Sequence, residues 1–115
     1  MARLDEIKDG TSNTLMAGET IVHKTTPPGQ FDARGAYFWG LWGGTLFNTY
    51  WPPNTQTPDR LDEAKLCYDT PETPCINSGD MTNYTRSRHR GGGFIAMADG
   101  AVRWMAVSYT HLTLQ

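Results

Sequence analysis

The sequence predicts a small α+β domain with an antiparallel β-sheet, a C-terminal β-hairpin, long irregular loops and little helix. The hairpin follows from Asp99-Gly100, which separates two short apolar runs at residues 93–98 and 101–107 and is the strongest short-range hairpin signal. The loops follow from 12 glycines and 7 prolines among 115 residues. Because only 38% of the residues are hydrophobic, we expect one domain with a small core in which Trp and Tyr supply much of the buried area.

The N-terminal segment predicts a short helix followed by a strand. Two apolar residues at helical spacing within residues 2–8 indicate one or two helical turns. Residues 14–24 have a β-like pattern around Gly18, where we expect a bulge or a bend. The prolines and the glycine of residues 25–29 then end this strand.

The central and C-terminal segments are less regular. Residues 37–47 form the densest apolar stretch, and their aromatic residues and glycines favour extended structure packed against the sheet. Residues 50–85 are rich in Pro, Asn, Thr and Asp, which predicts a long loop with one helical turn at residues 61–66. We expect a single globular domain over residues 1–107, followed by an unstructured or foreign tail at residues 108–115.

Two cysteines, Cys67 and Cys75, enclose seven residues within this loop. A disulfide between them would lower the entropy of the unfolded chain and so stabilise the fold by about 2 to 3 kcal/mol. It would also indicate a location outside the cytoplasm. The competing interpretation is a pair of free thiols or of metal ligands. No Cys-x-x-Cys spacing and no nearby His supports zinc, so we favour the disulfide.

The charge of the chain argues against several partners. A formal net charge of −2 gives no field that would gather nucleic acid or an anionic membrane. We interpret the local cluster of Arg86, Arg88 and Arg90 as a solvated loop that balances nearby carboxylates. No stretch approaches the roughly 18 apolar residues that a membrane-spanning helix needs.

Three motifs, spread over most of the chain, resemble those of a known family. They are the block DGTSNTLMAGE at residues 9–19, the loop formed by Asn48-Thr49 and Pro52-Pro53-Asn54, and His89 followed by nine residues and then Asp99-Gly100. They resemble the motifs of the bacterial H-X9-DG family, which has prepilin-type N-termini and is related to the type II secretion pseudopilins. The chain differs from the family pattern at Arg90 and Ala101, where Pro and Ser are expected.

The resemblance implies a pilin-like fold and an extracytoplasmic, non-enzymatic role as a globular head in surface assembly or secretion. Family members begin with a basic leader and a long apolar helix that anchors them in the inner membrane. The resemblance therefore implies that this chain is a C-terminal part whose parent carries such a helix. The implied partners are other pilin-like subunits or cell-surface components, and not nucleic acid.

We expect the residues of the first motif to build a turn. Asp9 accepts hydrogen bonds from downstream amides, Gly10 takes a positive φ, and Ser12 and Asn13 hydrogen-bond the local backbone. A calcium loop is the alternative, because related pseudopilins carry a calcium site. One Asp provides fewer carboxylates than such loops use, so we expect no metal and no cofactor.

The other motif residues are also expected to be structural. His89 and Asp99 lie at opposite ends of one predicted strand, on the order of 25 to 30 Å apart, so they cannot form an acid–base pair. We expect His89 to anchor the start of the strand through a hydrogen bond to backbone or a carboxylate, and Asp99 and Gly100 to shape the turn. No nucleophile elbow, phosphate loop or zinc motif occurs, so we expect no enzymatic activity.

Four aromatic residues suggest an alternative function, a secreted carbohydrate-binding module. Exposed rings stack on sugars, and the candidates are Trp39, Trp42, Tyr50 and Trp51. We expect these rings to belong to the core instead. Two coplanar rings facing solvent would reverse that expectation.

Overall fold

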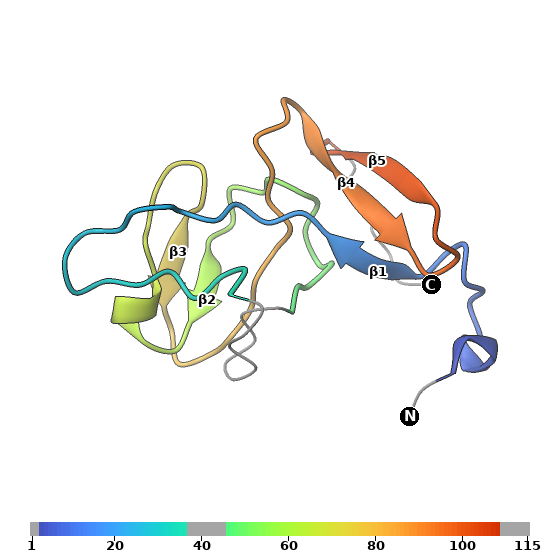
Figure 1. Cartoon of the computed structure of the whole chain (residues 1–115), viewed down its shortest axis with the longest axis horizontal. Coiled ribbons are helices and arrows are strands. Elements are labelled where there is room, and N and C mark those ends of the chain that lie inside the picture. The colour runs from blue at the N-terminus through green and yellow to red at the C-terminus, as the bar shows by residue number, and fades with distance from the viewer. Residues whose placement is uncertain (1–2, 37–45, 109–115) are drawn as a thin grey trace.

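A computed structural model of the chain describes residues 3–36 and 46–108 (Figure 1). Within these residues, helix is limited to two 3₁₀ turns, η1 (Leu4–Glu6) and η2 (Ala64–Leu66). The strands are β1 (Leu15–Gly18), β2 (Asp59–Leu61), β3 (Cys75–Asn77), β4 (Gly92–Met97) and β5 (Val102–Ala106). The expectations of a sheet-rich α+β fold, a C-terminal hairpin, long loops and little helix are confirmed.

Two separate sheets organise the described residues. β1, β4 and β5 form an antiparallel sheet with β4 in the middle, and β2 pairs with β3 in a parallel two-stranded sheet. In Figure 1 the three-stranded sheet lies at one end of the molecule and β2 and β3 at the other. The chain that leaves β1 crosses to β2 and β3 and returns before β4 begins.

The first strand is shorter than expected. β1 ends at Gly18, whereas the sequence predicted a strand over residues 14–24. Its irregularity lies between Leu15 and Ala17, and not at Gly18 as expected. Gly18 serves close packing instead: a Cβ there would collide with the Thr85 side chain and lie 3.1 Å from Cδ1 of Ile95.

The expectation of a strand-free loop over residues 50–85 is wrong. β2 and β3 lie in this segment, with the predicted helical turn present as η2 between them. Three-residue strands are too short to show a periodicity, so the sequence gives no signal for them. Cys67 and Cys75 form a disulfide with Cα atoms 6.1 Å apart, and both cysteines pack against the fully buried Leu61.

The hairpin turn has three residues and not the two that were expected. The amide of Met97 donates to the carbonyl of Ala101 at 2.8 Å, and the amide of Gly100 donates to the carbonyl of Met97 at 3.0 Å. Among the turn residues only Gly100 has a positive φ, of 88°. This is a type I turn followed by a glycine in the left-handed region, the usual three-residue hairpin loop.

The buried interior of the described residues contains charge as well as apolar side chains. Asp59 is 0% exposed and Arg86 is 2% exposed, and both lie as deep as Leu61 and Ile95. Arg86 is therefore not the solvated side chain that its cluster predicted, whereas Arg88 is exposed and lies 3.4 Å from Glu72.

The expectation that Trp and Tyr supply the core holds for Tyr84, which is buried, but not for the exposed aromatic residues. Tyr50 and Trp51 are 76% and 43% exposed, and Phe94 and Trp104 are also exposed. Trp39 and Trp42, the rest of residues 37–45 and the tail at residues 109–115 lie outside the described residues.

Candidate functional site

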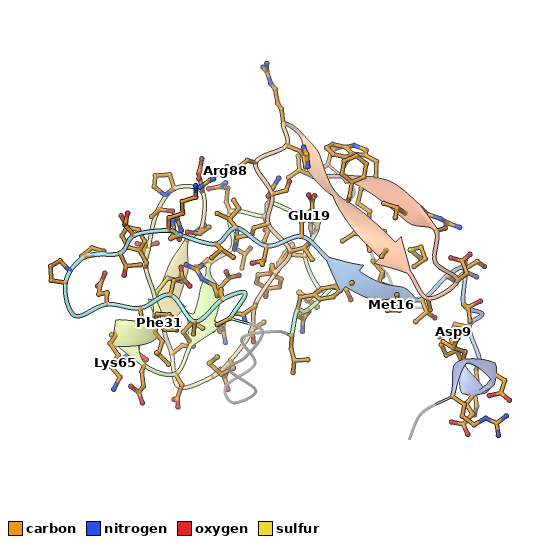
Figure 2. The ribbon with its side chains drawn as sticks, viewed as in Figure 1. Asp9, Met16, Glu19, Phe31, Lys65 and Arg88 are labelled. Carbon is orange, nitrogen blue, oxygen red and sulfur yellow. A yellow bond between two sulfur atoms is a disulfide. The ribbon has the colours of Figure 1, made fainter. Side chains whose placement is uncertain are left out.

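The three sequence motifs meet where β4 begins, at a cluster that we call the motif junction: Glu19, Asn54, Ser87 and His89. Glu19 comes from the end of the DGTSNT block, Asn54 from the PPN loop, and His89 from the H-X9-DG motif. Figure 2 shows Glu19 where the chain leaves β1, between the three-stranded sheet and the loops. Residues far apart in sequence thus converge on one strand end.

Glu19 joins the first motif to the third. Its Oε1 lies 3.0 Å from Nε2 of His89, and its Oε2 accepts a hydrogen bond from the Phe94 amide at 2.7 Å. The backbone carbonyl of Glu19 also accepts from the Arg86 amide at 2.9 Å. One carboxylate therefore holds both the histidine ring and the backbone of β4.

Asn54 joins the second motif to the same strand end. Its Oδ1 accepts from the Ser87 amide at 2.7 Å, and its Nδ2 donates to the Gly92 carbonyl at 2.9 Å. Asn54 has a φ of 58°, and among the described residues other than glycine it alone has a positive φ. Asparagine tolerates this left-handed conformation better than most residues, which accounts for its place at the end of the PPN loop.

The serine and the histidine of the junction are not arranged as a nucleophile and its base. Oγ of Ser87 donates to the Gly92 carbonyl at 2.6 Å, and the contact between Ser87 and His89 runs from the His89 amide to that Oγ at 3.3 Å. The His89 ring makes edge-to-face contacts with Phe94 and Trp104, with centroids 5.2 Å and 6.0 Å away. These contacts fix the ring as a packing element.

A groove of about 330 Å³ runs beside the junction. Its walls are residues 19–22 and residues 86–89, so Glu19 and His89 line it from opposite walls. The two walls are joined by the hydrogen bond from the Arg86 amide to Glu19. The groove is open and polar, which suits a short polar contact with a partner rather than the enclosure of a small molecule.

The opposite end of β4 joins the first and third motifs a second time. The amide of Asp99 donates to the Thr11 carbonyl at 3.1 Å, and the amide of Ala98 donates to the Thr14 carbonyl at 2.8 Å. Asp99 accepts from the Ala101 amide at 2.9 Å through Oδ1, which orders the hairpin turn. The DGTSNT block and the DG turn are therefore packed against each other.

Within the DGTSNT block, the roles of the residues differ in part from those expected. Gly10 has a φ of 82°, and Nδ2 of Asn13 donates to the backbone carbonyl of Asp9 at 3.1 Å. Within the described chain the carboxylate of Asp9 accepts no hydrogen bond, although we expected it to cap the turn, and Ser12 is exposed. No group of three His, Cys, Asp or Glu gathers around a metal position in residues 3–36 and 46–108.

A buried charge network lies next to the junction, and no pattern in the sequence predicted it. The Asp59 carboxylate accepts hydrogen bonds from Arg34 at 2.8 Å and from Arg86 at 3.0 Å. The Arg34 guanidinium also donates two hydrogen bonds to the Asp32 carboxylate. Arg86 donates further to the carbonyls of Thr55 and Thr57. The two arginines and two aspartates balance each other in charge.

The network alters two pKa values in the interior. Burial alone would lower the pKa of Arg34, but the hydrogen bonds and negative charges of Asp32 and Asp59 outweigh burial and raise it above its ordinary value. Burial, together with the charge of Asp59, raises the pKa of the Tyr84 hydroxyl. Arg34 is therefore charged at neutral pH.

The two exposed aromatic candidates form no platform for a sugar. The rings of Tyr50 and Trp51 have centroids 5.3 Å apart and meet at 85°. A stacking platform needs rings that face the same way, and this edge-to-face pair is not coplanar. Its geometry therefore does not support a sugar-binding platform.

Comparison with known protein families assigns the chain to one of them. A family model described as a protein of unknown function (DUF1559) matches residues 1–110, and the chain belongs to this family. No curated protein and no solved structure matches the chain. Among the helices of the described residues, none is long and apolar enough to span a membrane.

Proposed function

We propose that the chain is the non-enzymatic, extracytoplasmic globular head of a pilin-like or pseudopilin-like protein with a structural role in surface assembly or secretion. The observation that carries the proposal is the motif junction. All three family motifs contribute to holding the strand end together through Glu19, Asn54 and His89, rather than to lining a reactive centre.

The disulfide supports the extracytoplasmic part of the proposal. Bonded cysteines persist in oxidising compartments and are rare in the cytosol. Cys67 and Cys75 are bonded and buried, and together they close a loop whose carbonyls bind the buried Arg34. In this proposal the parent protein carries an apolar N-terminal helix in the inner membrane, and the partners are other pilin-like subunits or cell-surface components.

The test follows the full-length native protein, tagged at its C-terminus, in its own host. We expect the native reading frame upstream of Met1 to encode a basic leader and an apolar run of about 20 residues. The tag should be accessible to protease after the outer permeability barrier is opened, and the cysteines should resist alkylation until a reductant is added. The variant Cys67→Ser/Cys75→Ser is the labelling control.

Two results would overturn the proposal. One is a tag that is protected from protease in intact spheroplasts, together with cysteines that are alkylated without a reductant, because both place the head in the cytoplasm. The other is a hydrolytic activity of the purified chain that is lost in His89→Ala while the fold stays intact, because that would make the junction catalytic.

A further inference from the structure

Within the described residues, the three-stranded sheet has an unpaired edge on the β5 side. β5 pairs with β4 on one side, and on its other side it pairs with no strand of the described residues. Hydrogen bonds join Met97 to Ala101 and Gly91 to Val107, so the alternation of an antiparallel ladder turns the amides of Val102, Trp104 and Ala106 outward. An unpaired row of this kind is a template for another strand.

The face of the sheet beside this edge is apolar and exposed. Phe94 and Trp104 are directly paired across β4 and β5, with ring centroids 5.1 Å apart, and Val102 lies on the same face two residues along. These three side chains are 42%, 45% and 67% exposed. A strand added to β5 would extend this face and cover part of it.

The other edge of the sheet is a poorer template. β1 has four residues, and its register is broken between Leu15 and Ala17. Short and irregular edges discourage further pairing, whereas β5 has five residues in unbroken register. The sheet therefore offers one regular edge.

The charge along the hairpin selects both the partner and the direction of pairing. The start of β4 carries the exposed Arg90, whereas Arg88 just before it is already paired with Glu72 at 3.4 Å. The opposite end lies beside the exposed Asp9 and Asp99, which the Asp99-to-Thr11 hydrogen bond brings together. Figure 2 shows Asp9 at the end of the sheet far from the start of β4, whereas Arg88 lies beside the loops. A second copy in antiparallel orientation would set the basic end of each hairpin beside the acidic end of the other, whereas a parallel orientation would set like beside like.

We propose that β5 is a self-association edge, at which two copies of this chain pair their β5 strands antiparallel about a twofold axis at Trp104. This register uses all of Val102–Ala106, with Val102 of each copy opposite Ala106 of the other. The two sheets become one continuous sheet, and the aromatic faces of Phe94 and Trp104 merge across the axis. The inference rests on the proposed function, because it names a second copy as the partner of the head.

The test is the oligomeric state of the purified full chain, measured by sedimentation equilibrium over a range of concentrations. The twofold register puts residue 104 of one copy opposite residue 104 of the other, so Trp104→Lys and Trp104→Glu each place like charges together. Each variant alone should raise the dimer dissociation constant at least about tenfold, and an equal mixture of the two should restore the dimer. Met16→Lys and Met16→Glu, at an exposed position on the opposite edge, are matched controls that should leave the dimer unchanged.

A third variant keeps the proposal testable if the Trp104 variants do not fold. Val102→Pro removes an outward amide and leaves the bonds between β4 and β5 in place, so it should abolish the dimer while the hairpin persists. A wild-type chain that is monomeric at all concentrations, or a dimer that survives in Trp104→Lys and Val102→Pro, would overturn the proposal. Neither result bears on the compartment of the head, so a failure here is distinct from a failure of the proposed function.

Discussion

At the scale of single residues, the most consequential side chain is the carboxylate of Asp59. It is fully buried, and it accepts hydrogen bonds from two arginines and from the Tyr84 amide. Burying charge is costly unless every charge is paired, and here the pairing is complete because Arg34 and Arg86 also use backbone carbonyls. The network fixes the relative positions of four segments, residues 32–34, 55–59, 68–73 and 86, by hydrogen bonds instead of apolar packing.

Asp59→Asn should be strongly destabilising. It leaves the buried Arg86 without its carboxylate partner and Arg34 with Asp32 alone. Breaking a buried charge pair on one side costs about 3 to 5 kcal/mol. The measurement is the free energy of unfolding in urea. Asp80→Asn is the control, because its carboxylate is 70% exposed and lies 3.6 Å from an exposed Arg60. A loss in Asp59→Asn no larger than that in the control would contradict the buried network.

The raised pKa of Tyr84 predicts a loss of stability in alkaline solution. Because burial and the charge of Asp59 raise the pKa of Tyr84 in the folded state, the unfolded chain ionises first, near its ordinary pKa of about 10. The stability that the protonated Tyr84 hydroxyl contributes to the folded state is fully present below pH about 10, and it is lost as the pH rises through the pKa of Tyr84 in the folded state. Urea unfolding at pH 9 and pH 11 should show a smaller fall in Tyr84→Phe than in the wild type. An equal decrease in the free energy of unfolding of both proteins would contradict the role of Tyr84 in the loss of stability.

At the scale of elements, the hairpin is where sequence and structure agree best. Asp99 and Gly100 are adjacent in sequence, and a turn depends only on its own few residues, so local chemistry suffices to predict it. The charge network could not be predicted in the same way. Arg34 and Arg86 meet Asp59 across 25 and 27 residues of chain, and neither lies in a periodic pattern that marks it as buried. The pairing of β2 with β3 could not be predicted either, because it joins two short segments that are separated in the sequence.

The sequence also indicated which motif residues matter without showing how they combine. His89 was expected to bind a backbone group or a carboxylate, and its partner Glu19 lies 70 residues away, within another motif. Phe94 and Trp104 were missed because their strand alternation does not tell which face of the sheet is covered. The order of the motifs along the chain was the available signal for the junction.

Gly100→Val should destabilise the hairpin. A β-branched residue at a φ of 88° is strained by roughly 1 to 2 kcal/mol. A Cβ at this position would meet no other atom within 4 Å, so the expected loss is conformational and not steric. The melting temperature is the measurement. Gly100→Asn is the matched variant and should lose less, because asparagine tolerates the left-handed region; equal losses would refute the turn geometry.

Glu19 and His89 should be energetically coupled. A double-mutant cycle with Glu19→Gln and His89→Ala isolates the contact, whose partners are 35% and 48% exposed. For a pair at this level of exposure the expected coupling is about 0.2 to 1 kcal/mol, and it should decrease as salt is added. Urea unfolding of the four proteins measures it. Strict additivity of the two single changes would show that the ring and the carboxylate act independently.

At the scale of the whole molecule, the disulfide and the charge network support each other. The loop between Cys67 and Cys75 presents the carbonyls of Tyr68 and Thr73 to Arg34. The loop therefore both closes the β2–β3 region and completes the coordination of a buried guanidinium. The two-stranded sheet, too small to be stable alone, is held by these contacts.

Removing the disulfide should weaken the entire fold. The double variant Cys67→Ser/Cys75→Ser frees a short loop in the unfolded state, which costs about 2 to 3 kcal/mol in the chain-entropy model. The free energy of unfolding of this variant should match that of the wild type in reductant. A variant as stable as the oxidised wild type would show that the bond constrains nothing that the fold does not already fix.

The position of β1 in its sheet sets an order for folding. The β4–β5 hairpin closes over a three-residue turn, but β1 pairs with β4, whose last residue is Met97. A chain made from its N-terminus therefore carries an unpaired β1, and a Glu19 without its histidine, until nearly all of the domain has been synthesised. The three-stranded sheet can therefore close only after β4 has been made, late in the synthesis of the domain.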